Sequence, residues 1–221
     1  FTGLAFARAR CRRRGDLPPV AFHPHGLEMF QPAATWRSWA GMLTLRPVAS
    51  RLCRDADWVL SFPGKIRAIV ERRCGVRPEK IIETINAVDA SWLVPDRPAP
   101  GRIRRFVFVG RNERRKGMPE LVEAMRGLSG EGLEFHFVGP IPEEQRLRRA
   151  DVTYHGSITD TAALQSILDR SDVLLCPSWS EGMPTVVIEA MARGLAVIAT
   201  VLSGLPSLLR ATALLKAKVQ R

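Results

Sequence analysis

A glycine-bounded loop, GRNERRKG at residues 110–117, contains the first two side chains whose types suit ligand chemistry, Arg111 and Lys116. A planar guanidinium can bind a phosphate through two hydrogen bonds, and an ammonium group adds a mobile point charge. The glycines at the two ends, of which Gly110 is the first, allow tight turns and a close approach of the backbone to a ligand. The pair therefore suits a diphosphate. A solvated basic loop is the alternative, because two more arginines belong to the same run.

A second stretch, SWSEGMPTVVIEAMARG at residues 178–194, contains two carboxylates, Glu181 and Glu189. Glu181 lies in a Gly/Pro turn before a helix, and the first turn of a helix offers unpaired N–H groups to an anion. Glu189 lies among apolar residues, where a carboxylate is costly unless it receives hydrogen bonds. The two adjacent hydroxyls of a ribose are suitable donors, so this corner suits the nucleoside part of a ligand.

The backbone of the same corner is a further source of donors. Gly182 and Met183 can direct N–H groups at a phosphate, and Pro184 begins the helix. Each acid also has a simpler interpretation: Glu189 as a helix surface residue, and Glu181 as a partner of the helix dipole. The presence of both acids at one corner favours a binding site.

The segments around these loops alternate between strand and helix patterns. Short apolar runs predict strands at residues 105–110, 133–139, 152–156, 172–178 and 195–200. Amphipathic runs predict helices at residues 119–128, 142–150, 159–171 and 184–194. Both loops therefore follow strands, and ligands of open α/β sheets bind beyond the carboxyl ends of the strands. The alternation predicts a parallel sheet with helices on both faces.

A similar alternation comes earlier in the chain. It predicts strands at residues 17–23, 57–62 and 80–86, a helical pattern at residues 35–56 that Pro47 interrupts, and a helix at residues 64–75. The two blocks are separated by VPDRPAPGR at residues 94–102, and such a concentration of proline is typical of a linker. The sequence thus predicts an α/β protein with two domains, at residues 1–96 and 97–221.

Several function classes lack their motifs. The loop at residues 110–117 is not a P-loop, because G-x-x-x-x-G-K-[ST] is absent, and no strand leads into G-x-G-x-x-G. The four cysteines form no C-x-x-C pair, which argues against a zinc ribbon or a redox motif. A chain of 221 residues needs no disulfide framework, so we expect a reducing, cytoplasmic location.

The net charge of +11 points to an anionic partner: phosphate, nucleic acid or a membrane surface. A nucleic-acid binder is disfavoured, because no known module is recognisable and the chain has only one Tyr. The Arg-rich run at residues 8–14 is interpreted as a solvated helix face, with contact to the anionic inner face of a membrane as the alternative. The sequence contains no run of 18 uncharged apolar residues.

The combination of GRNERRKG with SEGMPTVVIEAMARG resembles the retaining glycosyltransferases of the GT-B fold, in the large family four. The signature of that family is an Arg and a Lys in the first loop of the C-terminal domain, followed by an E-x7-E motif. The four charged residues match it in order and spacing. HPHGLE at residues 23–28 and KIIETINAVDASWL at residues 80–93 also resemble the family's HG loop and its N-G-V-D segment. The likeness extends from about residue 18 to about residue 208.

The resemblance implies two Rossmann-like parallel-sheet domains, both incomplete because the chain looks truncated at both ends. Residues 1–96 would be the C-terminal part of the acceptor-side domain, and residues 97–221 a truncated nucleotide-sugar-binding domain. It further implies a hexosyltransferase-type enzyme that needs no metal and no cofactor. Its substrates would be a UDP- or GDP-sugar and a glycan, lipid-linked or small-molecule acceptor.

The resemblance also implies a role for each motif residue. Arg111 and Lys116 would bind the diphosphate, Glu189 the ribose and Glu181 the transferred sugar. The expected reaction is attack on the same face of the sugar, with the leaving phosphate accepting the proton of the acceptor. His25 would face the donor sugar, because in the family the His before the Gly of the HG loop does so.

Other residues have two open interpretations. His23 and His25 could bind a metal, but no third ligand is obvious nearby, and His25 could instead be a core or turn histidine without a role in binding. Gly156 and Ser157 could lie near the nucleotide or form a tight turn, and Trp179 could stack on the donor or only pack.

Two departures from the family pattern concern glycines: Ser203 replaces one in the G-G-x-P pattern, and Ala87 replaces that of N-G-V-D. Acceptor specificity therefore does not follow from the sequence. The rival functions are a nucleotide-sugar-binding protein without catalysis, a nucleotide-sugar epimerase and the nucleic-acid binder considered above.

Overall fold

The computed structural model describes residues 19–94, 97–98, 101–128 and 131–200. Among these, the chain forms two compact units. The first contains residues 19–85 together with Ser180–Met183, and the second contains residues 86–179 and 184–200. Each unit is built on its own parallel sheet. The fold class predicted from the sequence, two Rossmann-like parallel-sheet parts, is therefore confirmed.

The first unit has a three-stranded parallel sheet in the order β1-β2-β3. Its strands are β1 (Ala21–Phe22), β2 (Trp58–Ser61) and β3 (Ile81–Glu83). Its helices are α2 (Trp36–Leu43), α3 (Arg46–Asp55) and α4 (Lys65–Arg72), with the short 3-10 turns η1 (Glu28–Phe30) and η2 (Pro78–Lys80). The predicted helix at residues 35–56 is divided in two because Pro47, which cannot sit in a helix interior, occupies the first turn of α3.

The second unit has a five-stranded parallel sheet in the order β6-β5-β4-β7-β8. The strands are β4 (Arg105–Val109), β5 (Glu134–Val138), β6 (Val152–Gly156), β7 (Val173–Cys176) and β8 (Ala196–Ala199). The helices are α5 (Met118–Arg126), α6 (Thr161–Asp169) and α7 (Thr185–Ala192), and the 3-10 turns are η3 (Ala90–Trp92), η4 (Arg114–Lys116) and η5 (Glu143–Gln145). The five strands that the sequence predicts here are all present.

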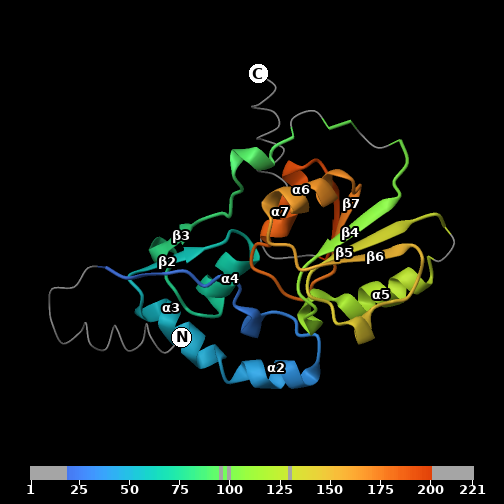
Figure 1. The fold of residues 1–221 in the computed structure, drawn as a ribbon. Helices are drawn as coiled ribbons and strands as arrows, with labels where there is room; N and C mark the ends of the chain where they lie inside the picture. The colour runs from blue at the N-terminus through green and yellow to red at the C-terminus, as the bar shows by residue number, and fades with distance from the viewer. Residues whose placement is uncertain (1–18, 95–96, 99–100, 129–130, 201–221) are drawn as a thin grey trace. The chain divides into compact units, whose positions relative to one another are not determined.

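The helices of the second unit lie on both faces of its sheet, as Figure 1 shows for α5 on one side and for α6 and α7 on the other. This follows from the strand order. The chain moves one way from β4 to β5 and the opposite way from β6 to β7 and β8, and right-handed crossovers in opposite directions put their helices on opposite faces. The face under α5 contains the aromatic core, with Phe108, Phe135 and Phe137 packed against Met118 and Met125.

The prediction of a helix at residues 142–150 is wrong. Only the three-residue turn η5 forms, and the backbone is extended at Arg146. The N–H of Leu147 is bonded to the hydroxyl of Tyr154 at 2.8 Å, and the guanidinium of Arg146 donates to the carbonyl of Ile141 at 3.0 Å. The first of these bonds gives the N–H of Leu147 a partner outside the segment in place of an intrahelical carbonyl. The Arg-rich segment also has no apolar stripe that would favour a helix.

The proline-rich stretch around residues 94–102 is attached to the second unit where it is described. The N–H of Val94 donates to the carbonyl of Ala192, and the guanidinium of Arg97 donates to the carbonyls of Leu168, Ser171 and Arg193. The segment is thus held by hydrogen bonds from its own side chains and backbone. The predicted domain boundary between residues 96 and 97 stays a prediction.

The pairing of β4 with β7 is fixed at its start by one aspartate. The carboxylate of Asp172 accepts the backbone N–H groups of Arg104 and Arg105, at 2.8 and 2.9 Å, and its own N–H donates to the carbonyl of Arg105. Phe106 then pairs with Val173 and Val107 with Leu174. This side chain therefore sets the register of the two central strands.

Replacement of Asp172 by alanine should lower the free energy of unfolding by about 1–2 kcal/mol, because two backbone donors lose a charged acceptor. Asp172→Asn retains one carbonyl oxygen and should lose less. Urea unfolding of both variants measures the difference. Equal stability of Asp172→Ala and the wild type would contradict the role of this side chain in fixing the register.

Candidate functional site

The basic loop that follows β4 is ordered by contacts within the second unit. The side chain of Arg111 is 79% exposed and lies 3.9 Å from a carboxylate oxygen of Glu113. Glu113 also accepts a 2.7 Å hydrogen bond from Arg115. Lys116 is half-buried, and a Cβ added at Gly110 would lie 3.9 Å from Cδ of the lysine side chain. The loop thus holds its lysine against the backbone and presents its first arginine to solvent.

Two glycines bring this loop into direct backbone contact with its neighbours. Gly117 has a φ of 74°, and a Cβ added there would lie 2.0 Å from the carbonyl oxygen of Pro177. Gly139 has a φ of 140°, and its added Cβ would lie 1.9 Å from the carbonyl oxygen of Gly110. Only glycine fits these positions. The loops after β4, β5 and β7 therefore meet at the carboxyl edge of one sheet, where α/β proteins bind ligands.

The turn that contains Glu181 belongs to the first unit, with the HG segment. The side-chain amide of Gln31 donates to the carbonyls of Gly26 and Glu181, at 2.5 and 2.9 Å. Gly182 lies directly on the carbonyl of His25, since an added Cβ would be 1.7 Å from that oxygen. The structure thus brings His25 together with the predicted residues of the turn, of which Glu181, Gly182 and Met183 are all buried.

The two histidines of the HG segment differ in exposure. His25 is exposed and stacks on His23, with ring centroids 4.3 Å apart. Burial, and secondly the neighbouring His25, lower the pKa of His23. In the part of the chain that the structure describes, no group of three or more His, Cys, Asp and Glu side chains is arranged to hold a metal ion. The expectation that the activity needs no metal stays a prediction.

Glu189 lies in α7, and Pro184 is the N-cap residue of that helix. Its side chain is half-buried, and this burial raises the pKa of its carboxyl group. Among the described contacts none is a hydrogen bond or ion pair to that carboxylate. A carboxylate that is kept from water without a partner costs stability, and such groups are typical of ligand-binding sites.

Trp179 has a packing role that the sequence left open. Its indole N–H donates to Glu120 at 3.1 Å, and its ring lies under the guanidinium of Arg114, 5.9 Å from the centroid. Its backbone N–H donates to the carbonyl of Arg115 at 2.7 Å. The residue therefore joins the turn after β7 to the basic loop after β4.

A pair of histidines on β5 and β6 was not singled out as a pair by the sequence. Nδ1 of His136 and Nε2 of His155 are 3.1 Å apart, and the rings stack at 5.3 Å. Burial is the main cause that lowers the pKa of both histidines. The nearby carboxylate of Glu134 raises the pKa of His136, whereas the charge of Arg170 lowers the pKa of both rings. Only the pairing of the two strands, which local patterns do not reveal, places them together.

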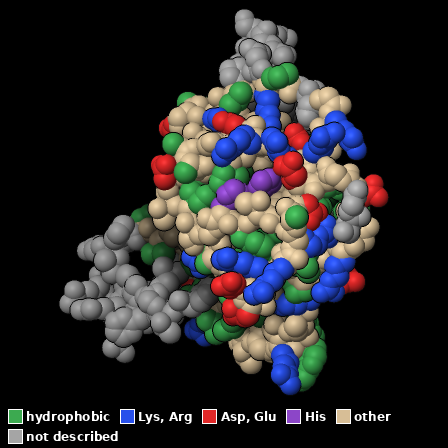
Figure 2. Space-filling model, turned by 45° about the vertical axis from the view of Figure 1, so that its right-hand side comes forward, with side chains coloured by type: hydrophobic (Ala, Val, Ile, Leu, Met, Phe, Trp, Pro, Cys, Tyr) green, Lys and Arg blue, Asp and Glu red, His purple; other side chains and the backbone are tan. Residues whose placement is uncertain are grey.

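The remaining predicted positions give less information. Gly156 accepts the N–H of Gly139 and has a φ of 69°, as a tight turn requires, and Ser157 is exposed. The Arg run at residues 8–14 and Ser203 lie outside the described residues. Figure 2 shows Lys and Arg side chains interspersed with Asp and Glu side chains, in line with ion pairs such as Arg105–Glu134 at 2.9 Å.

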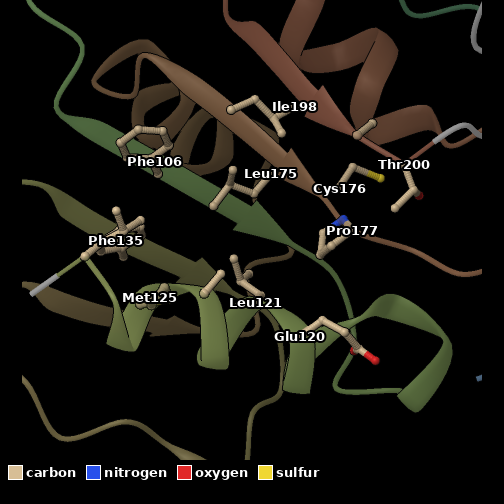
Figure 3. Close-up of a pocket in the computed structure, with 13 residues that line it drawn as sticks. Phe106, Glu120, Leu121, Met125, Phe135, Leu175, Cys176, Pro177, Ile198 and Thr200 are labelled. Carbon is tan, nitrogen blue, oxygen red and sulfur yellow. The ribbon is translucent and has the colours of Figure 1, made fainter.

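An apolar cavity of about 370 Å³ lies between α5 and the strands β4, β7 and β8 of the second unit. Figure 3 shows Leu121 and Met125 of α5 facing Leu175 across it, with Glu120 at one end and its carboxylate directed away from the apolar lining. None of the predicted site residues lines this cavity.

In the described part of the chain no helix is long and apolar enough to cross a bilayer, and the cellular location stays a prediction.

The family model described as "Glycosyl transferases group 1" matches residues 103–219, which is more than half of the chain. The chain therefore belongs to this family of glycosyl transferases. The matched region includes both the basic loop and the corner with the two acids.

Curated relatives agree with this assignment. The putative colanic acid biosynthesis glycosyltransferase WcaL of Salmonella typhimurium is 33% identical over 185 residues, which cover 75% of this chain and 44% of that protein. The putative teichuronic acid biosynthesis glycosyltransferase TuaC of Bacillus subtilis is 39% identical over 105 residues, 48% of this chain and 26% of that protein. The chain thus spans less than half the length of these relatives.

Solved structures show the same fold. Sucrose-phosphate synthase from Thermosynechococcus elongatus has a TM-score of 0.72 at 23% identity, covering 90% of this chain and 54% of that one. HepE of Anabaena, solved in complex with UDP and glucose, has a TM-score of 0.68 at 18% identity, covering 94% and 59%. These are glycosyltransferases of the GT-B fold, and the two parallel-sheet units of this chain follow that architecture.

Stability of the second unit should fall as the pH falls from 7.5 to 5.5. Because the pKa values of His136 and His155 are lowered in the folded state, the unfolded chain binds protons first, from a pH of about 6.5 downward. His155→Phe keeps a stacked ring but removes one titrating group, so it should reduce this fall. Urea midpoints at the two pH values measure it, and an unchanged fall in the variant would contradict the assignment.

Proposed function

We propose that this chain carries the donor site of a retaining, metal-independent glycosyltransferase, which moves a sugar from a nucleotide-sugar to an acceptor hydroxyl. The observation that carries the proposal is the parallel pairing of β4 with β7. It brings the basic loop and the turn before α7 into contact at one sheet edge, through Gly117 and Pro177. Arg111 and Lys116 belong to the first of these segments, and Glu189 lies in the helix α7 that follows the second.

Each residue has a proposed role in binding the donor. Arg111 and Lys116 bind the diphosphate, because a bidentate guanidinium and a mobile ammonium suit its oxygens. Glu189 accepts hydrogen bonds from the ribose hydroxyls, which would supply the partners that its half-buried carboxylate lacks among the described contacts. Glu181 and His25 belong to the first unit, and their proposed ligand is the transferred sugar. The N–H groups of Gly182 and Met183, in the same turn as Glu181, are proposed donors to a phosphate oxygen.

The proposed chemistry is a substitution at the anomeric carbon. The bond from that carbon to the diphosphate oxygen breaks while the acceptor oxygen attacks from the same face, and the acceptor proton moves to the leaving phosphate. Negative charge grows on the diphosphate as its bond breaks. Arg111 and Lys116 stabilise that charge more strongly in the transition state than in the ground state, which is the condition for catalysis.

The positive charge of the chain and one solved structure support a proposal for the donor class. HepE, which shares the fold, was solved with UDP-glucose, and we propose a UDP-sugar for this chain, with a GDP-sugar as the alternative. WcaL and TuaC are described as putative glycosyltransferases of colanic acid and teichuronic acid biosynthesis. The acceptor that we propose is a glycan, free or linked to a lipid. Binding of a donor without any transfer or hydrolysis would instead support a nucleotide-sugar-binding protein.

Arg111→Ala should lower turnover by about 10²–10³-fold, the usual loss when one donor to a developing charge is removed. Product release from a panel of UDP- and GDP-sugars measures it. Arg126→Ala is the control, because Arg126 is also exposed and pairs with an acid, Glu123, at 2.7 Å. Near-normal turnover of Arg111→Ala would reject the proposed role of Arg111.

Glu189→Gln should weaken nucleotide-sugar binding about tenfold and at the same time raise the melting temperature of the free protein. The first effect follows because a charged acceptor for the ribose becomes neutral. The second follows because burial raises the folded-state pKa of Glu189, so its ionised form destabilises the fold. The gain in stability should shrink as the pH falls through that pKa.

Calorimetry and thermal unfolding between pH 8 and pH 5 provide the two readouts for Glu189→Gln. Glu144→Gln is the control, since Glu144 is exposed on η5. A variant that binds the donor as tightly as the wild type would remove Glu189 from the site, whatever its melting temperature.

A further inference from the structure

Three side chains of the second unit form a network beside the basic loop. The guanidinium of Arg114 binds both carboxylate oxygens of Glu120, at 2.8 and 2.6 Å. The indole N–H of Trp179 donates to one of those oxygens at 3.1 Å, and the same guanidinium lies over the indole ring at 5.9 Å. We call Arg114, Glu120 and Trp179 the clasp.

The clasp joins three separate elements. Arg114 belongs to the 3-10 turn η4, Glu120 to the first turn of α5, and Trp179 to the turn after β7. Glu120 is the common acceptor, and its interaction with Arg114, with a further contribution from Trp179, lowers the pKa of its carboxyl group. The carboxylate is therefore ionised at neutral pH, and the network is complete there.

We propose that Glu120 is a positioning residue for the donor diphosphate, which acts by holding η4, and with it Lys116, in the conformation that binds. The proposal rests on the proposed function. A 3-10 turn of three residues has little stability of its own. The side chains of Arg114 and Glu120 are each about 40% exposed, so a single pair would contribute little. The bidentate geometry and the third partner make the clasp more effective than an isolated surface pair.

A simple charge argument predicts the opposite effect of Glu120. Glu120 is an acid near a site proposed for a diphosphate, so its neutralisation should tighten binding if only charge mattered. If Glu120 acts by position, its neutralisation frees Arg114 and η4, and the ligand must then pay the entropy of ordering the loop. The sign of the change in affinity therefore separates the two explanations.

The test uses four variants of the whole chain: Glu120→Gln, Trp179→Phe, these two changes combined, and Glu123→Gln. Glu123→Gln is the matched control, because it removes the same charge from the same helix and also breaks an ion pair, that with Arg126. Trp179→Phe keeps an aromatic ring under Arg114 but removes the indole N–H. Affinity is measured by calorimetry with UDP and GDP, and amide hydrogen exchange of residues 111–117 is measured without ligand.

We expect Glu120→Gln to weaken nucleotide binding about 3–10-fold and to accelerate exchange of residues 111–117, with smaller effects of Trp179→Phe. The combined variant should be little worse than Glu120→Gln alone, because both changes remove one network. Glu123→Gln should bind at least as tightly as the wild type and leave exchange unchanged. Melting temperatures of all variants should stay close together, which separates loop ordering from global stability.

Equal or tighter binding by Glu120→Gln, or exchange indistinguishable from that of Glu123→Gln, would overturn the proposal while the proposed function stands. Failure of the wild-type chain to bind either nucleotide would contradict the proposed function and the role of the clasp in donor binding. The exchange data, which need no ligand, would still decide whether the clasp orders the loop.

Discussion

The parallel pairing of β4 with β7, closed by backbone contact between Gly117 and Pro177, is the constraint on which the candidate site depends. Parallel neighbours end at the same edge of a sheet, so the segments that follow them meet there whatever their side chains. Asp172 fixes the register at the start of the pair. The charged residues of the basic loop then need only short-range contacts to reach their positions.

Most of the charged side chains named near this edge form ion pairs with one another. Glu113 accepts a hydrogen bond from Arg115, and Glu120 accepts one from Arg114. The side chain of Arg111 instead extends into solvent, and its ion-pair partner Glu113 is 3.9 Å away. An anion that binds here would therefore meet an exposed arginine with only a weak ion pair. The half-buried carboxylate of Glu189 is the complementary feature, since it favours a ligand that donates hydrogen bonds.

Much of the fold could be predicted from local patterns, because strands of apolar residues and amphipathic helices have recognisable periods. The wrong helix at residues 142–150 has a physical cause. The N–H of Leu147 donates to the hydroxyl of Tyr154 on β6, and a bond to a neighbouring strand leaves no mark on the local pattern. The motif residues could be found from spacing, but neither the clasp nor the assignment of the Glu181 turn to the first unit could.

The central claim is that the loop after β4 and the start of α7 form one binding site for a nucleoside diphosphate. Backbone amide NMR of the chain during titration with UDP, and separately with GDP, tests it most directly. The account predicts that signals from residues 111–117 and 185–189 shift together for at least one nucleotide, with a single dissociation constant. Shifts confined to one of these segments, or located on other surfaces of the second unit, would contradict it.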